Sequence, residues 1–176
     1  AEFGYTYAEL GFLMTVFFIV SGGSQAFAGF VVDRYGAGGT LIAGLLCLTC
    51  AAIGFGISAS YAQLVAAAAL AGLGNSVFHP VDYSLLNAQV SESRLGPAYS
   101  VHGLTGSLGW AFAPVFLVGL ATPFGWRVAV LSAALVPIFV IVTLMFNSDL
   151  MASKVREEPD KQSDDTGASH SMAFLR

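Results

Sequence analysis

Five long apolar stretches, separated by short connectors, limit what this chain can fold into. A helix of about 20 apolar residues spans the roughly 30 Å hydrocarbon core of a bilayer. The stretches cover residues of about 10–32, 41–58, 62–86, 98–121 and 128–146. The alternating apolar and polar pattern of a transmembrane β-barrel does not recur. We therefore predict an all-α polytopic membrane protein whose five transmembrane helices form an antiparallel array.

The charged residues gather at one end of the chain. Only 10% of residues are charged, whereas about 25% is usual in a soluble domain. Ten of the eighteen charged side chains lie between positions 149 and 176. We predict that residues 1–146 form the helical bundle and that residues 147–176 are a disordered cytoplasmic linker or tail. The apolar ending "AFLR" favours a linker between two membrane blocks, and a plain C-terminal tail is the alternative.

Basic residues indicate how the bundle is oriented. Six of the seven Lys and Arg residues fall on one side of the predicted array and only Arg127 on the other. Because cytoplasmic loops are enriched in Lys and Arg, we expect the C-terminal tail to be cytoplasmic and the N-terminus to lie outside.

Several function classes lack support in the sequence. No basic patch interleaved with aromatic residues indicates nucleic-acid binding. Cys47 and Cys50 form a C-x-x-C within an apolar stretch, where ordinary buried thiols are expected. No G-x-S-x-G, H-E-x-x-H or phosphate-binding loop is present, so we predict no enzyme activity, no metal, no cofactor and no direct coupling to ATP.

The third apolar stretch carries an unusual polar cluster. Asn75, His79 and either Asp82 or Tyr83 are spaced to share one helical face, and Pro80 is expected to bend the helix. Polar groups in the hydrocarbon core normally face a bundle interior or a water-filled path. His79 and Asp82 are therefore candidates for substrate contact or proton coupling. Alternatively, His79 is a neutral core residue bonded to Asn75 or to a freed carbonyl, and Asp82 caps the inner end.

Two other stretches contain further candidates. In the first stretch, Gln25 stands near mid-membrane, where it either makes an interhelical hydrogen bond or lines a pathway. In the fourth, His102 lies about one turn inside the cytoplasmic end and could meet His79 across the bundle. The small residues of the fourth stretch favour close helix packing, and with its proline they are Gly103, Gly106, Gly109 and Pro114.

The connector after the first stretch resembles a family signature. Gly29, Asp33, Arg34 and Gly36 match the G-x-x-x-D-R-x-G part of the loop between helices two and three of the major facilitator superfamily. Gly29 would allow close helix approach and Gly36 a tight reversal. Ala37 and Gly38 stand where the family usually has two cations. The "FGWR" string resembles the family's entry into its sixth helix.

The third stretch is similar to the fosmidomycin-resistance-like branch of that family. Its "GLGNSVFHP" string matches the GLG-x-x-x-FHP typical of helix four in that branch. The order of elements matches helices two to six and the central linker, so the resemblance implies a fragment that lacks its first helix and its second six-helix half.

The resemblance implies a secondary active transporter that moves a small molecule by alternating access, coupled to protons. Its expected partners are the lipid bilayer, a small-molecule substrate, H⁺ and the missing second half, in a bacterial inner membrane. The alternative is a non-transporting membrane subunit for anchoring or assembly, which uses only the packing glycines.

Overall fold

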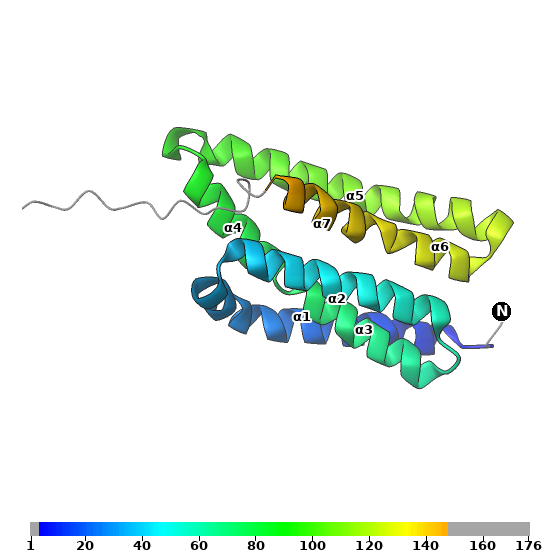
Figure 1. Cartoon of the computed structure of the whole chain (residues 1–176). Coiled ribbons are helices and arrows are strands. Elements are labelled where there is room, and N and C mark those ends of the chain that lie inside the picture. Colours follow the sequence, from blue (N-terminus) through cyan, green and yellow to red (C-terminus); the bar gives the residue numbers. More distant parts are fainter. Residues whose placement is uncertain (1–3, 148–176) are drawn as a thin grey trace, which may run out of the picture.

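The computed structural model describes residues 4–147 and consists, in that range, of helices alone (Figure 1). The helices are α1 (Tyr7–Tyr35), α2 (Ala37–Ile57), α3 (Tyr61–Asn75), α4 (Phe78–Gln89), η1 (Glu92–Arg94), α5 (Leu95–Phe124), α6 (Trp126–Ala133) and α7 (Leu135–Phe146). By length and hydropathy they make five candidate membrane spans. The predicted all-α polytopic class is therefore confirmed.

Two of the five spans are interrupted. The third runs from Tyr61 to Gln89 and breaks between α3 and α4, and the fifth divides into α6 and α7. Most helices also extend a few residues beyond the predicted apolar stretches. Hydropathy marks only the residues suited to hydrocarbon, whereas helical hydrogen bonding continues into the interfacial region.

The break in the third span lies just before Pro80. Ser76 ends α3 with its backbone N–H directed to the carbonyls of Gly72 and Leu73, and its hydroxyl donates to the Leu73 carbonyl at 2.7 Å. Pro80 is the third residue of α4, where a missing backbone N–H is tolerated because the first turn has no helical acceptor. The bend predicted at Pro80 is thus a division into two helices.

The helices form two layers. Helices α1, α2 and α3 lie together, α5 runs alongside α6 and α7, and α4 crosses between the layers (Figure 1). Val81 of α4 is fully buried in a small core with Val32 of α1 and Ala37 of α2. Many large apolar side chains are exposed, including Phe30 and Phe139. Exposed apolar surface on this scale is expected where lipid is the solvent.

Tight reversals join the long helices. Gly36 separates α1 from α2 with φ of +82°, and Gly125 separates α5 from α6 with φ of +84°. A positive φ favours glycine because it has no Cβ. The reversal predicted at Gly36 is therefore present.

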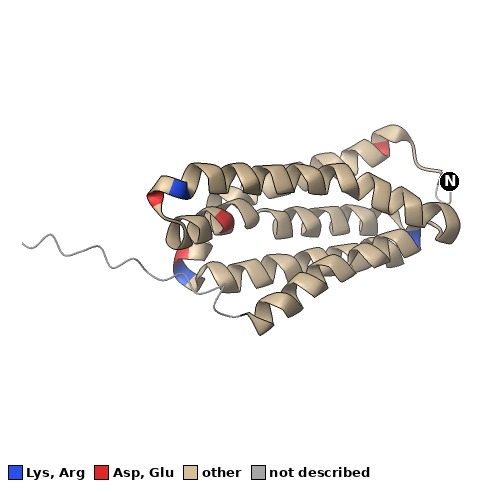
Figure 2. Cartoon of the chain, turned by 90° about the horizontal axis from the view of Figure 1, so that it is seen from above, with Lys and Arg blue, Asp and Glu red and all other residues tan. Residues whose placement is uncertain are grey.

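Hydrogen bonds at the end of the bundle that holds Gly125 tie the helices together. The Tyr61 hydroxyl donates to the Glu9 carbonyl at 2.8 Å, joining α3 to α1. The Arg127 guanidinium donates to the Gly56 carbonyl at 2.8 Å, near the C-terminus of α2, and lies over the Trp126 ring. A cation at a helix C-terminus also complements the helix dipole. Basic residues occur at both ends of the bundle (Figure 2).

The closest backbone approaches involve glycines of α3. A Cβ on Gly72 would lie 2.5 Å from the Phe17 carbonyl oxygen of α1, and one on Gly74 would lie 2.7 Å from the Gly44 carbonyl oxygen of α2. By contrast, a Cβ on Gly29, Gly103, Gly106 or Gly109 would meet nothing within 4 Å. The close approach predicted at Gly29 is therefore absent among the described residues. The packing role predicted for the α5 glycines and for Pro114 stays a prediction.

We predict that Gly74→Ala destabilises the bundle and that Gly119→Ala does not. Both glycines are within helices, so alanine improves helix propensity equally, but only Gly74 faces a backbone oxygen that cannot move aside. Overpacking of this kind costs roughly 1–3 kcal/mol. The measurement is the monodisperse fraction of each variant after heating in detergent. Equal melting of the two variants would contradict the assignment.

Candidate functional site

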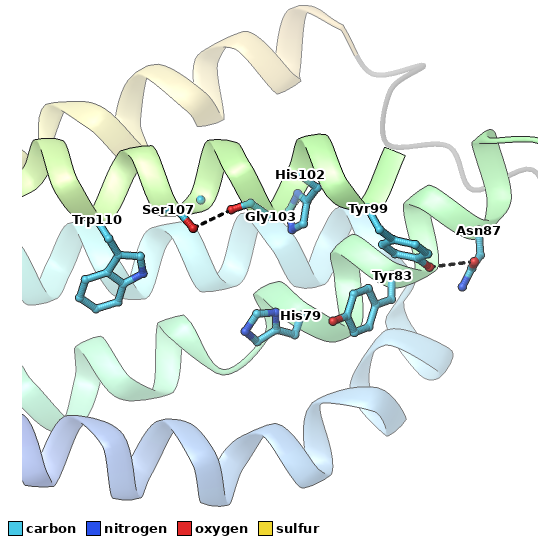
Figure 3. A pocket seen from close by; sticks show the side chains of 9 residues that line it. His79, Tyr83, Asn87, Tyr99, His102, Gly103, Ser107 and Trp110 are labelled. Carbon is cyan, nitrogen blue, oxygen red and sulfur yellow. Dashed lines mark hydrogen bonds between the residues drawn. The ribbon is translucent and has the colours of Figure 1, made fainter. Parts of the chain in front are cut away.

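The candidate site is a pocket between α4 and α5. It has a volume of about 590 Å³ and is lined by His79, Tyr83, Asn87, Tyr99, His102, Gly103, Gly106, Ser107 and Trp110 (Figure 3). This volume lies within the usual range for small-molecule sites, about 300–1,000 Å³. The residues come from α4, the second half of the polar third span, and from the facing part of α5.

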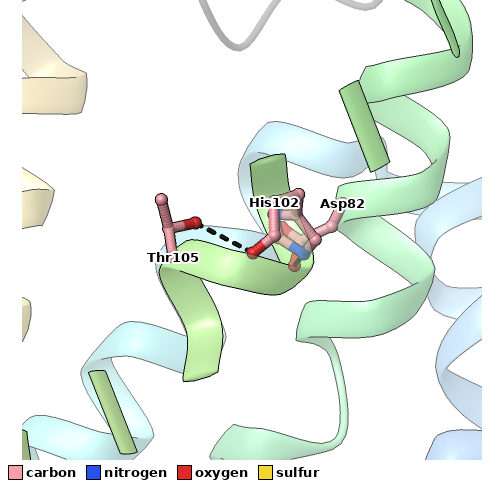
Figure 4. Close-up of polar contacts among 3 residues, drawn as sticks. All are labelled: Asp82, His102 and Thr105. Atoms are coloured by element: carbon pink, nitrogen blue, oxygen red, sulfur yellow. Dashed lines mark hydrogen bonds and ion pairs between the residues drawn. The ribbon is translucent and has the colours of Figure 1, made fainter. Parts of the chain in front are cut away.

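An ion-pair contact connects the two helices beside this pocket. His102 Nε2 lies 3.2 Å from Asp82 Oδ2, and the two side chains are 40% and 24% exposed (Figure 4). Asp82 adjoins the buried Val81, so α4 directs one residue to the α1–α2 core and the next to α5. A partly buried carboxylate is favoured there only with a partner, which the imidazole supplies.

Aromatic and polar contacts extend this connection. The Tyr99 hydroxyl donates to Asn87 Oδ1 at 2.9 Å, and the Tyr99 ring meets Tyr83 edge to face at 5.4 Å between centroids. The His79 ring stacks with Tyr83 at 6.1 Å. Helices α4 and α5 are therefore held by specific polar and aromatic contacts, with the side chains pointing into the space between them (Figure 3).

Three of the five predicted pathway residues meet at this place. His79 and His102 line the pocket, and Asp82 pairs with His102. His102 and His79 line the same pocket, but the direct contact of His102 is with Asp82. Their roles in a pathway stay predictions.

The other two predicted residues lie elsewhere. Asn75 Nδ2 donates to the buried Ser21 Oγ of α1 at 2.9 Å, so its amide joins α3 to α1. On an unbroken helix Asn75 and His79 would share one face. The break after Asn75 places them on different helices, α3 and α4. Gln25 of α1 is half-buried and does not line the pocket. The alternative in which Asn75 holds His79 is not the arrangement observed.

The loop motif is exposed at the same end of the bundle. Asp33 and Arg34 are exposed at the end of α1, and the Arg34 guanidinium lies 5.8 Å from the Tyr35 ring centroid. Within residues 4–147, no group of three or more His, Cys, Asp and Glu side chains is placed to hold a metal ion.

Sequence reasoning missed Tyr99, Asn87 and Trp110. A usable signal existed, because antiparallel neighbours lie at similar distances from their connector. Asp82 and His102 each stand ten residues from Glu92, and Asn87 and Tyr99 bracket the same short 3₁₀ turn. Pairing polar residues across the connector would have found both contacts.

A second pocket adjoins the first on the connector side. It has a volume of about 720 Å³ and includes Arg94, Val101 and His102 in its lining. His102 thus lies between two cavities, one toward the membrane interior and one toward the α4–α5 connector.

Comparison with known proteins identifies relatives over most of the chain. Residues 1–172 match the family model of the Major Facilitator Superfamily. The fosmidomycin resistance protein of Escherichia coli is 28% identical over 125 residues, which are 71% of this chain and 30% of that protein. A Cupriavidus pinatubonensis protein named "Probable 4-methylmuconolactone transporter" is 32% identical over 143 residues, covering 79% of this chain and 33% of that protein.

A third relative is named for a different role. The membrane sensor protein UhpC of Salmonella typhimurium is 30% identical over 139 residues, which are 79% of this chain and 31% of that protein. The chain therefore spans about a third of the length of the curated relatives it matches. No solved structure matches significantly. The five candidate spans and the family match together establish that this multi-pass membrane chain belongs to the major facilitator superfamily.

Proposed function

We propose that this chain is part of a secondary active transporter that moves a small molecule by alternating access, coupled to protons. The observation that carries the proposal is the pocket between α4 and α5, which combines His79 with the Asp82–His102 pair in a chain of this family. Two relatives named for drug resistance and for transport support it. The expected setting is a bacterial inner membrane, with residues 147–176 on the cytoplasmic side.

The arrangement of helices suits a moving element. Helix α4 packs on α1 and α2 through Val81 but reaches α5 through the Asp82–His102 contact. A break precedes α4, so its motion need not distort α3. In alternating access, one group of helices rocks against another around a site near their interface. The second transporter half would close the pocket and supply the rest of the site.

Proton coupling is assigned to the groups that face one another here. His79 stacks with Tyr83 on α4 and shares the pocket with Tyr99 and His102 of α5, and Asp82 of α4 pairs with His102. Imidazoles change protonation near neutral pH, so a substrate that alters their surroundings can take up or release a proton. Asn75, whose amide joins α3 to α1, and Gln25 of α1 remain candidates for lining the path elsewhere in the bundle.

We predict that His79→Ala in the full-length protein abolishes transport or uncouples it from the proton gradient. Removal of the imidazole deletes a titratable group that points into the pocket. Uptake or efflux by proteoliposomes is measured with and without an imposed pH gradient. His170→Ala, in the predicted tail, is the matched control. Unchanged flux with unchanged pH dependence in the His79→Ala protein would contradict the assignment of His79 to proton coupling.

The pair between α4 and α5 should be needed for full transport activity. We expect Asp82→Asn and His102→Gln each to reduce transport about tenfold, the equivalent of about 1.4 kcal/mol. The double variant should be no worse than the poorer single variant, because both remove one interaction. The exchanged pair, Asp82→His with His102→Asp, should restore part of the activity. Additive losses, measured as initial rates at equal protein amounts, would show that the two residues act separately.

A non-transporting role is the second candidate, because one relative carries the name of a membrane sensor protein. In that case the pocket would bind a small molecule without releasing it across the membrane. The two functions differ in one measurement, since a sensor binds the ligand but gives no counterflow in proteoliposomes.

A further inference from the structure

The lining of the pocket between α4 and α5 also indicates the chemistry of its ligand. We infer that the pocket binds a small, flat aromatic monocarboxylate. This inference deepens the proposed transport function and rests on it, because it names the substrate class for the same site.

The charged groups around the pocket limit the charge of its ligand. The carboxylate of Asp82 is in contact with His102 Nε2, so it is already matched by a cationic or donor partner. The pocket lining contains His79 and His102 but no Asp, Glu, Lys or Arg. An organic cation would find no carboxylate without a partner, whereas a phosphate-like dianion would find none of the Arg or Lys groups that such ligands require. A single negative charge fits both limits.

The polar groups of the pocket that have no hydrogen-bond acceptor are mainly N–H donors. The Trp110 indole N–H is a donor only, and the Asn87 amide nitrogen and the His79 imidazole also carry N–H groups. None of these three donates a hydrogen bond to the residues that the structure describes. The Asn87 oxygen already accepts from Tyr99 at 2.9 Å, which fixes its amide nitrogen as the free end. The pocket therefore presents donors, and a carboxylate supplies two acceptor oxygens.

The shape of the pocket favours a flat ring. Tyr83, Tyr99 and Trp110 contribute aromatic walls, and Gly103 and Gly106 form one side of the pocket without side chains. A Cβ on Gly106 would meet nothing within 4 Å, so the bare backbone leaves open space. Aromatic rings prefer offset or edge-to-face contacts with other rings, and such contacts add about 0.5–1.5 kcal/mol beyond area burial. A flat ring against this side would meet aromatic edges and keep its carboxylate among the donors.

The test uses the full-length protein in nanodiscs with four probes. Benzoate is the aromatic monocarboxylate, cyclohexanecarboxylate has the same charge without the flat ring, benzyltrimethylammonium is the cation and phenylphosphonate the dianion. Binding is measured by calorimetry, and transport by counterflow in proteoliposomes. We expect benzoate to bind at least about tenfold more tightly than each of the other three, a difference of about 1.4 kcal/mol.

Two glycine variants locate the binding. Gly106→Val places a branched side chain in the open space of the pocket and should abolish benzoate binding. Gly109→Val makes the same change on α5 but outside the pocket lining and should leave binding unchanged. Neither position has a close neighbour among the described residues, so we expect both variants to fold equally well. Thermal melting of both variants checks this.

The outcomes separate the ligand class from the function. Benzoate binding that Gly106→Val removes, without counterflow, would uphold the ligand class and overturn transport. Proton-dependent flux of the cation or the dianion, unaffected by Gly106→Val, would uphold transport and overturn the ligand class. Absence of binding by all four probes would also overturn the ligand class.

Discussion

The structure depends on how one membrane span tolerates a break in its backbone hydrogen bonding. Within the hydrocarbon core, a backbone N–H or carbonyl without a partner costs several kcal/mol because water is absent. Pro80 lacks a backbone N–H donor. The span accommodates this by dividing, so that α3 ends at Asn75 and α4 begins at Phe78. Ser76 uses its own N–H and hydroxyl on the last carbonyls of α3. The break is also buried against neighbouring helices, as the contacts of Gly72 and Gly74 with α1 and α2 show.

The same break separates two kinds of helix contact. Upstream, α3 is held by small residues that bring backbones together, and Asn75 adds a hydrogen bond to Ser21. Downstream, α4 reaches α5 through an ion pair, a tyrosine hydroxyl and aromatic rings. Backbone packing is rigid because it has no side-chain freedom, whereas polar side chains can exchange partners or protons. The rigid and the adjustable parts of one span therefore meet at Ser76 and Val77.

Hydropathy predicted the fold class and the five spans because lipid imposes a simple requirement of length and apolarity. The polar cluster around His79 was also visible, since charged and polar groups are costly in such a stretch. The direction of each side chain was not predictable. Asn75 and His79 share a face on an unbroken helix, and only the break sends one to α1 and the other to the pocket. Likewise, glycines of α5 match a packing pattern as well as those of α3, and only three-dimensional neighbours distinguish them.

The glycines of α3 and those of α5 have different surroundings. Gly74 of α3 and Gly44 of α2 each face the other's carbonyl oxygen, and Gly72 of α3 faces the Phe17 carbonyl oxygen of α1, so a side chain at these positions must displace a main-chain oxygen. Those of α5 face open space in the described part of the chain, and two of them, Gly103 and Gly106, line the pocket. A helix that needed only lipid contact would favour larger apolar residues at these positions, because glycine weakens a helix by about 1 kcal/mol relative to alanine. At Gly103 and Gly106 this loss of helix stability goes with an open wall of the pocket between α4 and α5, which larger apolar side chains would fill.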